Sequence, residues 1–315
     1  MWKYTGTKEC NSFLLSLNLF DYNDESKYIK TLYSITNNKK SNYKIYKIKK
    51  NNGKYRTIYE PSPLLKQIQK NILVNILNNK SISKYAKAYH KGISLVDNAR
   101  PHTNKKQLLK LDIKDFFENI SFLDVYNSCF SIEYFPKSVG MLLTYLCTYD
   151  DHLTQGSPTS AYISNLVMKD FDEKIGGWCE SRNITYTRYS DDMTFSGDFN
   201  PSEVIIEVKK LLNKLSLELN TSKIHVVKRS FAQIVTGIVV NEKAQVSKKY
   251  RKEIRKEIYY IDKYGIKSHL EMIKSDLNPH EYLKTLYGKI LYVLQVDEKN
   301  SEFLKYKKMV EKLLK

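Results

Sequence analysis

The chain has 315 residues, 42% of them hydrophobic, and carries 52 Lys and Arg against 34 Asp and Glu, a formal net charge of +18. The apolar content supports a folded protein with a sizeable core, arranged as one large domain or two to three lobes. The positive charge is spread along the chain and favours a nucleic acid as partner, although a solvated lysine-rich surface without a function would give the same count.

The cysteines and the apolar segments exclude several classes of protein. Cys10, Cys129, Cys147 and Cys179 show neither a CxxC pair nor a paired Cys/His spacing, which argues against a zinc site or a disulfide framework and predicts reduced core thiols. No apolar run reaches 18 residues, and the N-terminal MWKYTGTKECNSF lacks the apolar stretch of a signal peptide. We therefore expect a cytoplasmic protein.

The first strongly patterned segments lie between residues 43 and 76. Residues 43–48 and 55–59 predict a β-hairpin with a polar turn at Asn51-Asn52-Gly53. Ser62 and Pro63 then predict the N-cap and first residue of a helix. Its expected apolar stripe is Leu64, Ile68, Ile72 and Ile76.

The middle of the chain alternates strands and helices. A strand over 107–113 ends near Asp112, and a helix is expected after Gly156-Ser157-Pro158, with Ile163, Leu166, Val167, Phe171, Ile175 and Trp178 on one face. Two strands surround residues 190–192, and a helix is expected over 203–215. This order predicts an α+β sheet domain. From about residue 247 the pattern becomes helical and basic.

Two adjacent carboxylates interrupt the paired strands. In YTRYSDDMTFS, residues 186–196, Asp191 and Asp192 lie at a turn, where like charges repel unless water or a cation surrounds them. With Asp112 at the end of a neighbouring strand, they would hold two metal ions for phosphoryl transfer. Taken alone, the Asp-Asp pair is more typical of a solvated turn than of a metal site.

Three ordered motifs change the weight of these alternatives. LDIKDFF (111–117) resembles the first catalytic motif of reverse transcriptases, TQGSPTS (154–160) resembles their nucleotide-binding turn, and YSDD (189–192) matches their YxDD box. Thr154 and Ser190 depart from the usual Pro and Ala, which are small changes. The resemblance implies a right-hand polymerase fold with fingers, palm and helical thumb.

The resemblance also implies domain boundaries and metal ligands. We expect a helical extension over 1–40, fingers over 41–106, a palm with an inserted fingers segment over 107–246, and a basic helical thumb over 247–315. Asp112, Asp191 and Asp192, together with the backbone of Ile113, would hold two Mg²⁺ ions, which Mn²⁺ can replace.

The nucleotide-binding residues follow from the same comparison. The resemblance assigns this role to Arg56, Asp115, Phe117, Gln155, Gly156 and Lys223. Phe117 matches the steric gate that would crowd a ribose 2′-hydroxyl, although core packing would equally explain an aromatic residue there. Arg56 resembles the fingers residue that contacts the incoming triphosphate, and Lys223 resembles the lysine that follows the palm helix. The alternative for each is an ordinary surface cation in a basic chain. Gly156 would allow close backbone approach, although a plain helix-start turn would also use it.

Two further stretches narrow the family. Asn98-Ala99-Arg100-Pro101-His102 matches the NAxxH signature of retron reverse transcriptases, and Val235-Thr236-Gly237 matches their VTG element. A zinc-binding role for His102 is discounted because no partner ligands stand at suitable spacing. The leading interpretation is a retron enzyme. The alternatives are another bacterial reverse transcriptase, of the group II intron or abortive-infection type, and a catalytically silent RNA-binding scaffold.

Membership of the retron family would imply a specific reaction and specific partners. Such an enzyme copies its cognate structured noncoding RNA, with deoxynucleoside triphosphates, into branched msDNA primed from the 2′-hydroxyl of an internal guanosine. It serves antiphage defence, with an effector protein encoded nearby. We expect no RNase H domain after the thumb, so a host RNase H would remove the template.

The basic last lobe is the expected RNA-binding surface. Residues 247–315 hold 17 Lys and Arg against 10 Asp and Glu, with tyrosines interleaved among the cations. Such a surface would hold an RNA backbone and stack on unpaired bases, whereas in the alternative its tyrosines only pack internally. The expected RNA-binding residues are Asn98, His102, Lys248, Lys249, Tyr250, Arg251, Lys252 and Arg255.

Overall fold

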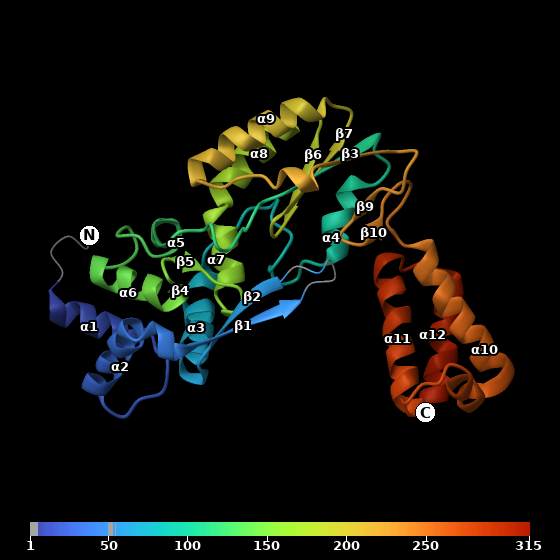
Figure 1. The fold of residues 1–315 in the computed structure, drawn as a ribbon, viewed down its shortest axis with the longest axis horizontal. Coiled ribbons are helices and arrows are strands. Elements are labelled where there is room, and N and C mark those ends of the chain that lie inside the picture. Colours follow the sequence, from blue (N-terminus) through green and yellow to red (C-terminus); the bar gives the residue numbers. More distant parts are fainter. Residues whose placement is uncertain (1–5, 50–52, 54) are drawn as a thin grey trace. The chain divides into compact units, whose positions relative to one another are not determined.

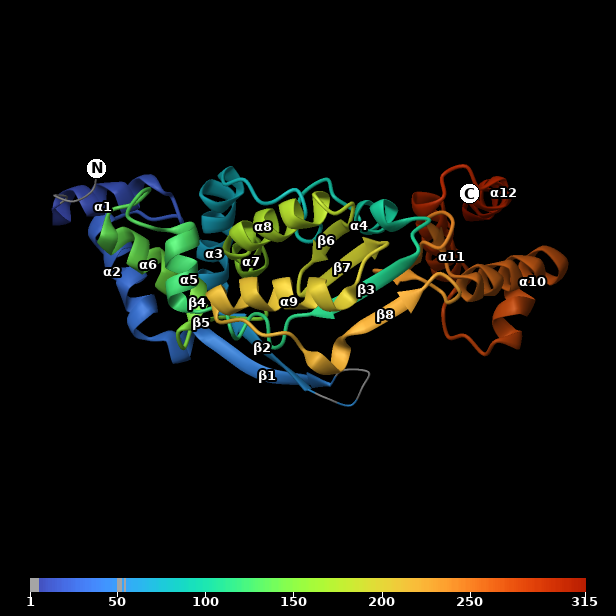
Figure 2. The same ribbon diagram turned by 90° about the horizontal axis from the view of Figure 1, so that it is seen from above.

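The computed structural model describes residues 6–49, 53 and 55–315. These residues form two compact units, each assembled from segments that are distant in the sequence (Figures 1 and 2). Unit 1 comprises the described residues up to Gly92, together with Lys110–Thr194 and Phe199–His225. Unit 2 comprises Ile93–Leu109, Phe195–Asp198 and Val226–Lys315. The domain boundaries expected from the sequence stay a prediction.

Helices make up most of both units. The α-helices are α1 (Thr7–Ser16), α2 (Glu25–Asn37), α3 (Pro63–Asn75), α4 (Leu95–Ala99), α5 (Phe122–Cys129), α6 (Lys137–Cys147), α7 (Ser160–Val167), α8 (Lys169–Glu180), α9 (Pro201–Leu212), α10 (Lys248–Met272), α11 (Pro279–Val296) and α12 (Ser301–Leu314). Short 3₁₀ helices are η1 (Lys39–Asn42), η2 (Leu77–Asn79), η3 (Arg100–His102), η4 (Asn213–Leu215) and η5 (Thr221–Lys223).

The strands form one four-stranded sheet and three smaller ones. They are β1 (Tyr43–Lys49), β2 (Tyr55–Pro61), β3 (Gln107–Asp112), β4 (Thr148–Tyr149), β5 (His152–Leu153), β6 (Thr185–Tyr189), β7 (Asp192–Gly197), β8 (His225–Lys228), β9 (Ile234–Val235), β10 (Ile238–Val239) and β11 (Gln245–Val246). The four-stranded sheet has the order β6-β7-β3-β8. This order makes β3 and β7 neighbours, as the chemistry inferred for their aspartates requires.

The hairpin and the helix after it form largely as expected. β1 and β2 pair antiparallel from Tyr43 opposite Pro61 to Lys49 opposite Tyr55, while the turn predicted at 51–53 lies mostly outside the described residues. Ser62 caps α3, its Oγ accepting from the backbone N of Leu65. The predicted stripe was wrong at one position, because Leu64 is 37% exposed and Leu65 is buried in its place. The buried face of α3 therefore runs through Leu65, Ile68 and Ile72, at positions i, i+3 and i+7. This is the broad apolar stripe that a helix packed on a core presents.

The helix predicted after Pro158 is interrupted. Two helices, α7 and α8, replace it and meet at Met168, whose ψ of −1° departs from ideal helical geometry. Ile163, Phe171 and Ile175 are buried as expected. In Figures 1 and 2, α8 and α9 run side by side along the sheet, and this packing supports the strands that carry the aspartates.

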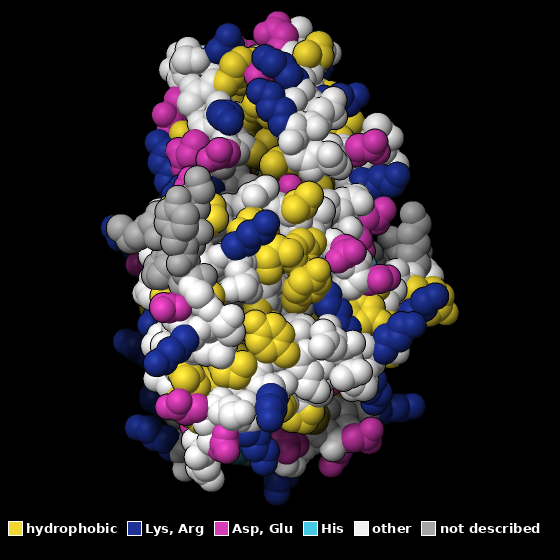
Figure 3. Space-filling view, turned by 90° about the vertical axis from the view of Figure 1, so that its left-hand side faces the viewer, with side chains coloured by type: hydrophobic (Ala, Val, Ile, Leu, Met, Phe, Trp, Pro, Cys, Tyr) yellow, Lys and Arg dark blue, Asp and Glu magenta, His cyan; other side chains and the backbone are white. Residues whose placement is uncertain are grey.

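At its N-terminal end, unit 1 packs α1, α2 and α6 together. Tyr28 is fully buried there, and its hydroxyl accepts from the Leu19 backbone N and donates to the Leu14 carbonyl. Figure 3 shows this end of the unit, where hydrophobic side chains gather between scattered basic and acidic ones. The positive charge of the chain is therefore not concentrated on this face.

Unit 2 has its own core. Val235, Ile238 and Val240 join buried residues of α4 and of α10–α12, including Ile254, Ile290 and Phe303, in one hydrophobic cluster. α10 begins after the N-cap Ser247 and contains a non-helical residue at Gly265, with φ of 78°. The thumb-like helices therefore pack against the segment that bears the VTG motif.

Two expectations about residue classes can be compared with this fold. All four cysteines are free and buried, which confirms the prediction of reduced core thiols. None of the helices in the described part of the chain combines the length and the apolar character that crossing a bilayer would require.

Candidate active site

The strand order brings the three predicted aspartates to one place in unit 1. β3 ends at Asp112, which is 5% exposed, and the turn between β6 and β7 contains Ser190 and Asp191. The backbone N of Ile113 donates to the Asp191 carbonyl at 3.1 Å, which ties the end of β3 to this turn. The two strands are neighbours in one sheet, which is the condition for Asp112 to act together with the aspartates of the turn.

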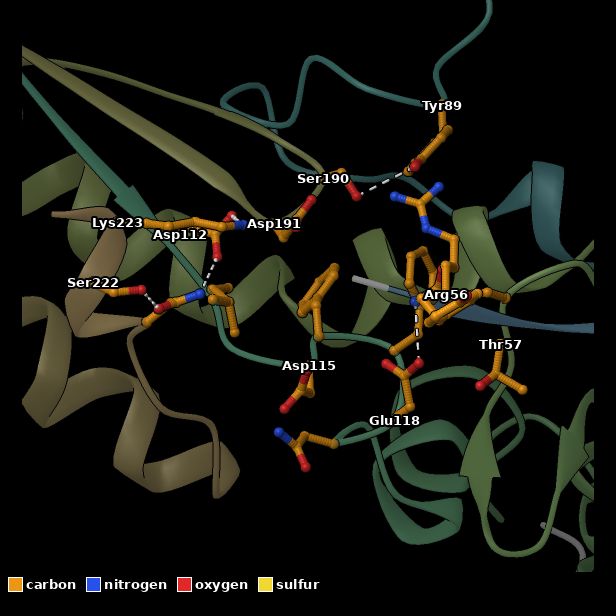
Figure 4. A pocket seen from close by; sticks show the side chains of 17 residues that line it. Arg56, Thr57, Tyr89, Asp112, Asp115, Glu118, Ser190, Asp191, Ser222 and Lys223 are labelled. Atoms are coloured by element: carbon orange, nitrogen blue, oxygen red, sulfur yellow. Dashed lines mark hydrogen bonds and ion pairs between the residues drawn. The ribbon is translucent and has the colours of Figure 1, made fainter. Parts of the chain in front are cut away.

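A cavity of about 870 Å³ opens beside the aspartates. Figure 4 shows Arg56, from β2, on one side of this cavity and Asp112 and Lys223 on the other, with Asp191 between them. The cavity is also lined by four further predicted residues, which are Ile113, Asp115, Phe117 and Gln155. Gly156 and Asp192 are not among the lining residues. The cavity therefore places cations and carboxylates around one space large enough for a nucleotide.

Asp112 is held by two side chains from the segment that follows α9. Lys223 Nζ lies 2.6 Å from Asp112 Oδ2, and the Asn220 amide donates to Oδ1 at 3.3 Å. Burial alone would lower the pKa of Lys223, but its hydrogen bond and attraction to Asp112 raise that pKa overall. Lys223 is thus a charged partner of the Asp112 carboxylate rather than a surface cation without contacts.

The surroundings of Asp191 and Asp192 disfavour the ionised form of both carboxyl groups. The pKa of Asp191 is raised by burial and by the charge of Asp112. The pKa of Asp192 is also raised, by loss of hydration around its carboxyl group and by Asp191, although the residue as a whole is exposed. A bound cation would relieve both effects, because it favours the charged form of each group.

The candidate ligand atoms are of the type that Mg²⁺ prefers, but the carboxylates do not converge on one point. Carboxylates and the Ile113 carbonyl provide only oxygen ligands, which hard divalent cations prefer. Within the described ranges, no three His, Cys, Asp or Glu side chains are close enough together to hold a metal ion. Asp112 is instead paired with Lys223.

The turn at Gln155 and Gly156 is built against β2. The backbone N of Tyr59 donates to the Gln155 carbonyl at 2.8 Å. Gly156 has φ of 123°, and a Cβ there would lie 2.6 Å from the Tyr59 carbonyl oxygen. A side chain is excluded on both grounds, so this glycine is required by the contact between turn and strand. Arg56, three residues before Tyr59, is exposed beside the cavity.

The structure separates the roles of the two phenylalanines. Both residues line the cavity, but Phe116 is 3% exposed and packs in the core, whereas Phe117 is half-buried. Their ring centroids lie 5.5 Å apart. Core packing is therefore satisfied by Phe116, which leaves Phe117 available to contact a nucleotide sugar.

Among the cavity residues that sequence reasoning missed, Glu118 and Tyr89 make hydrogen bonds to the predicted motifs. Glu118 accepts from Gln155 Nε2 at 3.1 Å, and the Tyr89 hydroxyl donates to Ser190 Oγ at 3.2 Å (Figure 4). Glu118 adjoins the LDIKDFF motif and could have been found by extending that motif by one residue. Tyr89 has no local signal, because only the tertiary fold brings it to the YxDD turn.

Asn98 and His102 were expected to bind RNA, but the structure places both in the interior of unit 2. They are 1% and 0% exposed, respectively. His102 Nδ1 lies 2.7 Å from Ser196 Oγ on β7, and Asn98 Nδ2 lies 3.4 Å from Thr236 Oγ1 of the VTG segment. Neither side chain is accessible to RNA, so the expected direct contact is not formed. Both side chains instead make polar contacts inside unit 2.

The basic residues at the start of α10 divide into two groups. Lys248, Lys249 and Lys252 are exposed, whereas Arg255 makes a two-pronged contact with Glu302 at 2.6 Å for each bond. Arg251 donates to Gln245 at 3.0 Å, and the Tyr250 ring packs edge-on against Tyr292. The exposed lysines are therefore better placed for a nucleic acid than the arginines.

Comparison with known proteins agrees with these motifs. The reverse transcriptase (RNA-dependent DNA polymerase) family matches residues 48–255. The retron Ec86 reverse transcriptase of Escherichia coli is 31% identical, over 82% of this chain and 78% of the relative. The retron Ec83 enzyme of Escherichia coli is 32% identical, over 66% and 71%, and the retron Mx65 enzyme of Myxococcus xanthus is 28% identical, over 83% and 63%.

Among solved structures, a telomerase from Candida albicans, in complex with a fragment of telomeric RNA, aligns with a TM-score of 0.49. It is 10% identical, and the alignment covers 90% of this chain and 67% of that one. The family match and the retron relatives bear out both the suspected family and the right-hand polymerase class of fold. The chain belongs to the retron reverse transcriptases and is an RNA-directed DNA polymerase.

Proposed function

We propose that this enzyme copies a structured noncoding RNA into branched msDNA, beginning from the 2′-hydroxyl of an internal guanosine of that RNA. The observation that carries the proposal is the cavity in which Asp112, Asp191 and Lys223 face Arg56 and Gln155. The retron family supplies the expectation of an internal guanosine primer. A role in antiphage defence, with a nearby effector protein and a host RNase H, belongs to the same proposal.

The residues suit nucleotidyl transfer. A hydroxyl oxygen attacks the α-phosphorus of a deoxynucleoside triphosphate, a new P–O bond forms, and pyrophosphate leaves with the electron pair of the broken bond. Asp112, Asp191 and Asp192, with the Ile113 carbonyl, would hold Mg²⁺ or Mn²⁺, which supplies charge neutralisation and alignment when bound. Arg56 would contact the triphosphate, with Asp115, Gln155 and Gly156 shaping the nucleotide site, and Phe117 would contact the sugar.

The surface of α10 supports an RNA partner. Tyr259 and Tyr264 are 55% and 53% exposed, and Lys263 Nζ lies 5.6 and 5.1 Å from their ring centroids. Exposed rings beside a cation can stack on unpaired bases while the cation contacts phosphate. Lys248, Lys249 and Lys252 extend this basic surface toward the start of the helix.

One experiment distinguishes the proposal from its alternatives. The gene is expressed with its native flanking DNA, beside an Asp191→Ala/Asp192→Ala variant, and the copurified nucleic acid is sequenced with and without debranching enzyme. We expect short DNA joined 2′ to 5′ to an RNA of the same locus, absent from the variant. Linear DNA extended from a 3′ end would contradict the priming mechanism, and RNA without DNA would favour the scaffold.

A further inference from the structure

A charged network lies buried directly behind the YxDD turn. Arg188, on β6, and Asp172, on α8, are both fully buried, and Tyr186 is 4% exposed. Arg188 is also among the largest fully buried side chains of the described chain. Burying a guanidinium is costly unless its donors are paired, so the partners of Arg188 indicate why it is there.

Asp172 fixes one side of the guanidinium. Arg188 Nε donates to Asp172 Oδ1 at 2.9 Å, and Nη2 donates to Oδ2 at 2.6 Å. The Tyr186 hydroxyl donates to the same Oδ1 at 2.8 Å. A planar guanidinium held by two parallel bonds has little rotational freedom, and its remaining nitrogen points in a defined direction.

That remaining nitrogen contacts the catalytic turn. Arg188 Nη1 donates to the carbonyl oxygen of Ser190 at 3.0 Å. Ser190 has φ of 61°, a left-handed conformation that is strained for a residue with a side chain. The carbonyl of Ser190 belongs to the peptide that leads into Asp191, so its orientation sets the direction in which the two carboxylates leave the turn.

We propose that Arg188 is a positioning residue for DNA synthesis: it holds the Ser190–Asp191 peptide in its left-handed turn and thereby presents Asp191 to the cavity. Asp172 and Tyr186 hold the guanidinium in place. The inference rests on the proposed catalytic role of Asp191 and Asp192. A purely structural role, in which the ion pair only joins α8 to β6, is the competing explanation.

Two variants separate positioning from stability. Arg188→Lys keeps a positive charge for Asp172 but loses the rigid three-way geometry. The triple variant Arg188→Met/Asp172→Leu/Tyr186→Phe removes the whole network without leaving a buried charge or hydroxyl unpaired, a type of replacement that often preserves stability. Lys84→Met/Glu180→Gln, which removes an exposed ion pair also anchored on α8, is the matched control.

The measurements are thermal unfolding, hydrogen exchange of the amides of residues 190–193, and extension of a DNA primer on an unstructured RNA template. For each folded variant we expect at least a ten-fold loss of kcat, a KM for the nucleotide within about three-fold of wild type, and at least ten-fold faster exchange in the turn. The control should match wild type in all three.

The opposing results are distinct. Wild-type kcat and exchange in a folded Arg188→Lys or triple variant would overturn the positioning role. If Arg188→Lys does not fold, the triple variant carries the same test, and the failure of both to fold would favour the purely structural explanation. Asp191→Ala/Asp192→Ala is measured in parallel, because synthesis by that variant would instead overturn the proposed function.

Discussion

At the scale of single residues, the site combines groups whose environments differ sharply. Asp112 is buried and paired with Lys223, whereas Asp191 and Asp192 have raised pKa values because burial and neighbouring charge disfavour their ionised forms. Carboxyl groups with perturbed pKa values are typical of functional sites, including those that bind cations or transfer phosphoryl groups. The same scale separates two residues of the cavity lining, because Phe116 is buried in the core and Phe117 is only half-buried.

Phe117→Ala should weaken sugar selectivity while leaving the fold intact. The half-buried ring would crowd a ribose 2′-hydroxyl, so its removal should lower the preference for deoxynucleotides by about 10–100-fold. The check is the ratio of kcat/KM for dGTP and GTP on one primed template. Unchanged selectivity would show that another group excludes the ribose.

At the scale of elements, strand and helix contacts place residues that local motifs cannot. His102 of η3 contacts Ser196 of β7, four residues after Asp192, so the NAxxH segment contacts the strand that follows the YxDD turn. Gly156 allows the turn at residues 155–156 to approach β2 closely. Both cases depend on a pairing between segments that are far apart in the sequence.

His102 should make stability fall with acid. Burial lowers its pKa to about 3, with Lys105 adding to the shift, so the unfolded chain takes up a proton near pH 6.5 that the folded chain resists. Its contribution is fully present above pH 6.5 and declines as the pH falls toward 3. Between pH 7 and 5, wild type should lose about 2 kcal/mol more unfolding free energy than His102→Asn.

Urea unfolding at the two pH values measures this difference. Asn is the suitable replacement because its amide can take the place of Nδ1 opposite Ser196 without titrating. His225→Asn, the same substitution at an exposed position, is measured in parallel. Equal losses in wild type and His102→Asn would contradict the burial of a neutral imidazole.

Gly156→Ala should destabilise the protein, whereas Gly177→Ala should not. At Gly156 the new methyl would meet the Tyr59 carbonyl oxygen at 2.6 Å with φ of 123°, and such strain costs about 1–3 kcal/mol. Gly177 lies in α8, and a Cβ at that position would meet no atom within 4 Å, so Ala there should stabilise by about 0.5–1 kcal/mol. Urea unfolding of both variants gives the comparison, and similar effects at the two positions would refute the close contact.

At the scale of the whole molecule, the charge of +18 must be matched by a partner or by solvent. The face in Figure 3 mixes both signs of charge, whereas α10 starts with exposed lysines and carries exposed tyrosines farther along. Arg255 is committed to Glu302, so the charge available to RNA on this helix comes from its lysines.

Replacing these lysines should weaken RNA binding in a salt-dependent way. For Lys248→Ala/Lys249→Ala/Lys252→Ala, the slope of log affinity against log salt should become shallower by about 2, because each lost phosphate contact removes about 0.7–0.9. Fluorescence anisotropy with a transcript of the flanking locus measures the slope. Lys209→Ala/Lys210→Ala/Lys214→Ala, around the end of α9, removes the same charge and should leave it nearly unchanged; equal slopes for both triple variants would argue against α10 as the RNA surface.

The sequence by itself determined the chemistry and most elements. The YSDD, LDIKDFF and TQGSPTS segments are recognisable because carboxylates, turns and strand ends require particular residues at short spacing, and the hairpin, α3, β3 and α10 follow from local periodicity and caps. Local patterns do not encode which neighbour covers a given face, and this explains the misplaced Leu64 and the break at Met168.

Only the tertiary structure decided what lies behind the site. It buried Asn98 and His102, brought Glu118 and Tyr89 to the cavity, and placed Arg188 between Asp172 and Ser190. An arginine beside a turn looks like any other cation in a basic chain, because its burial depends on α8, a separate segment that supplies the matching carboxylate. The energy of such a group is set by its surroundings in space, and these exist only once the chain has folded.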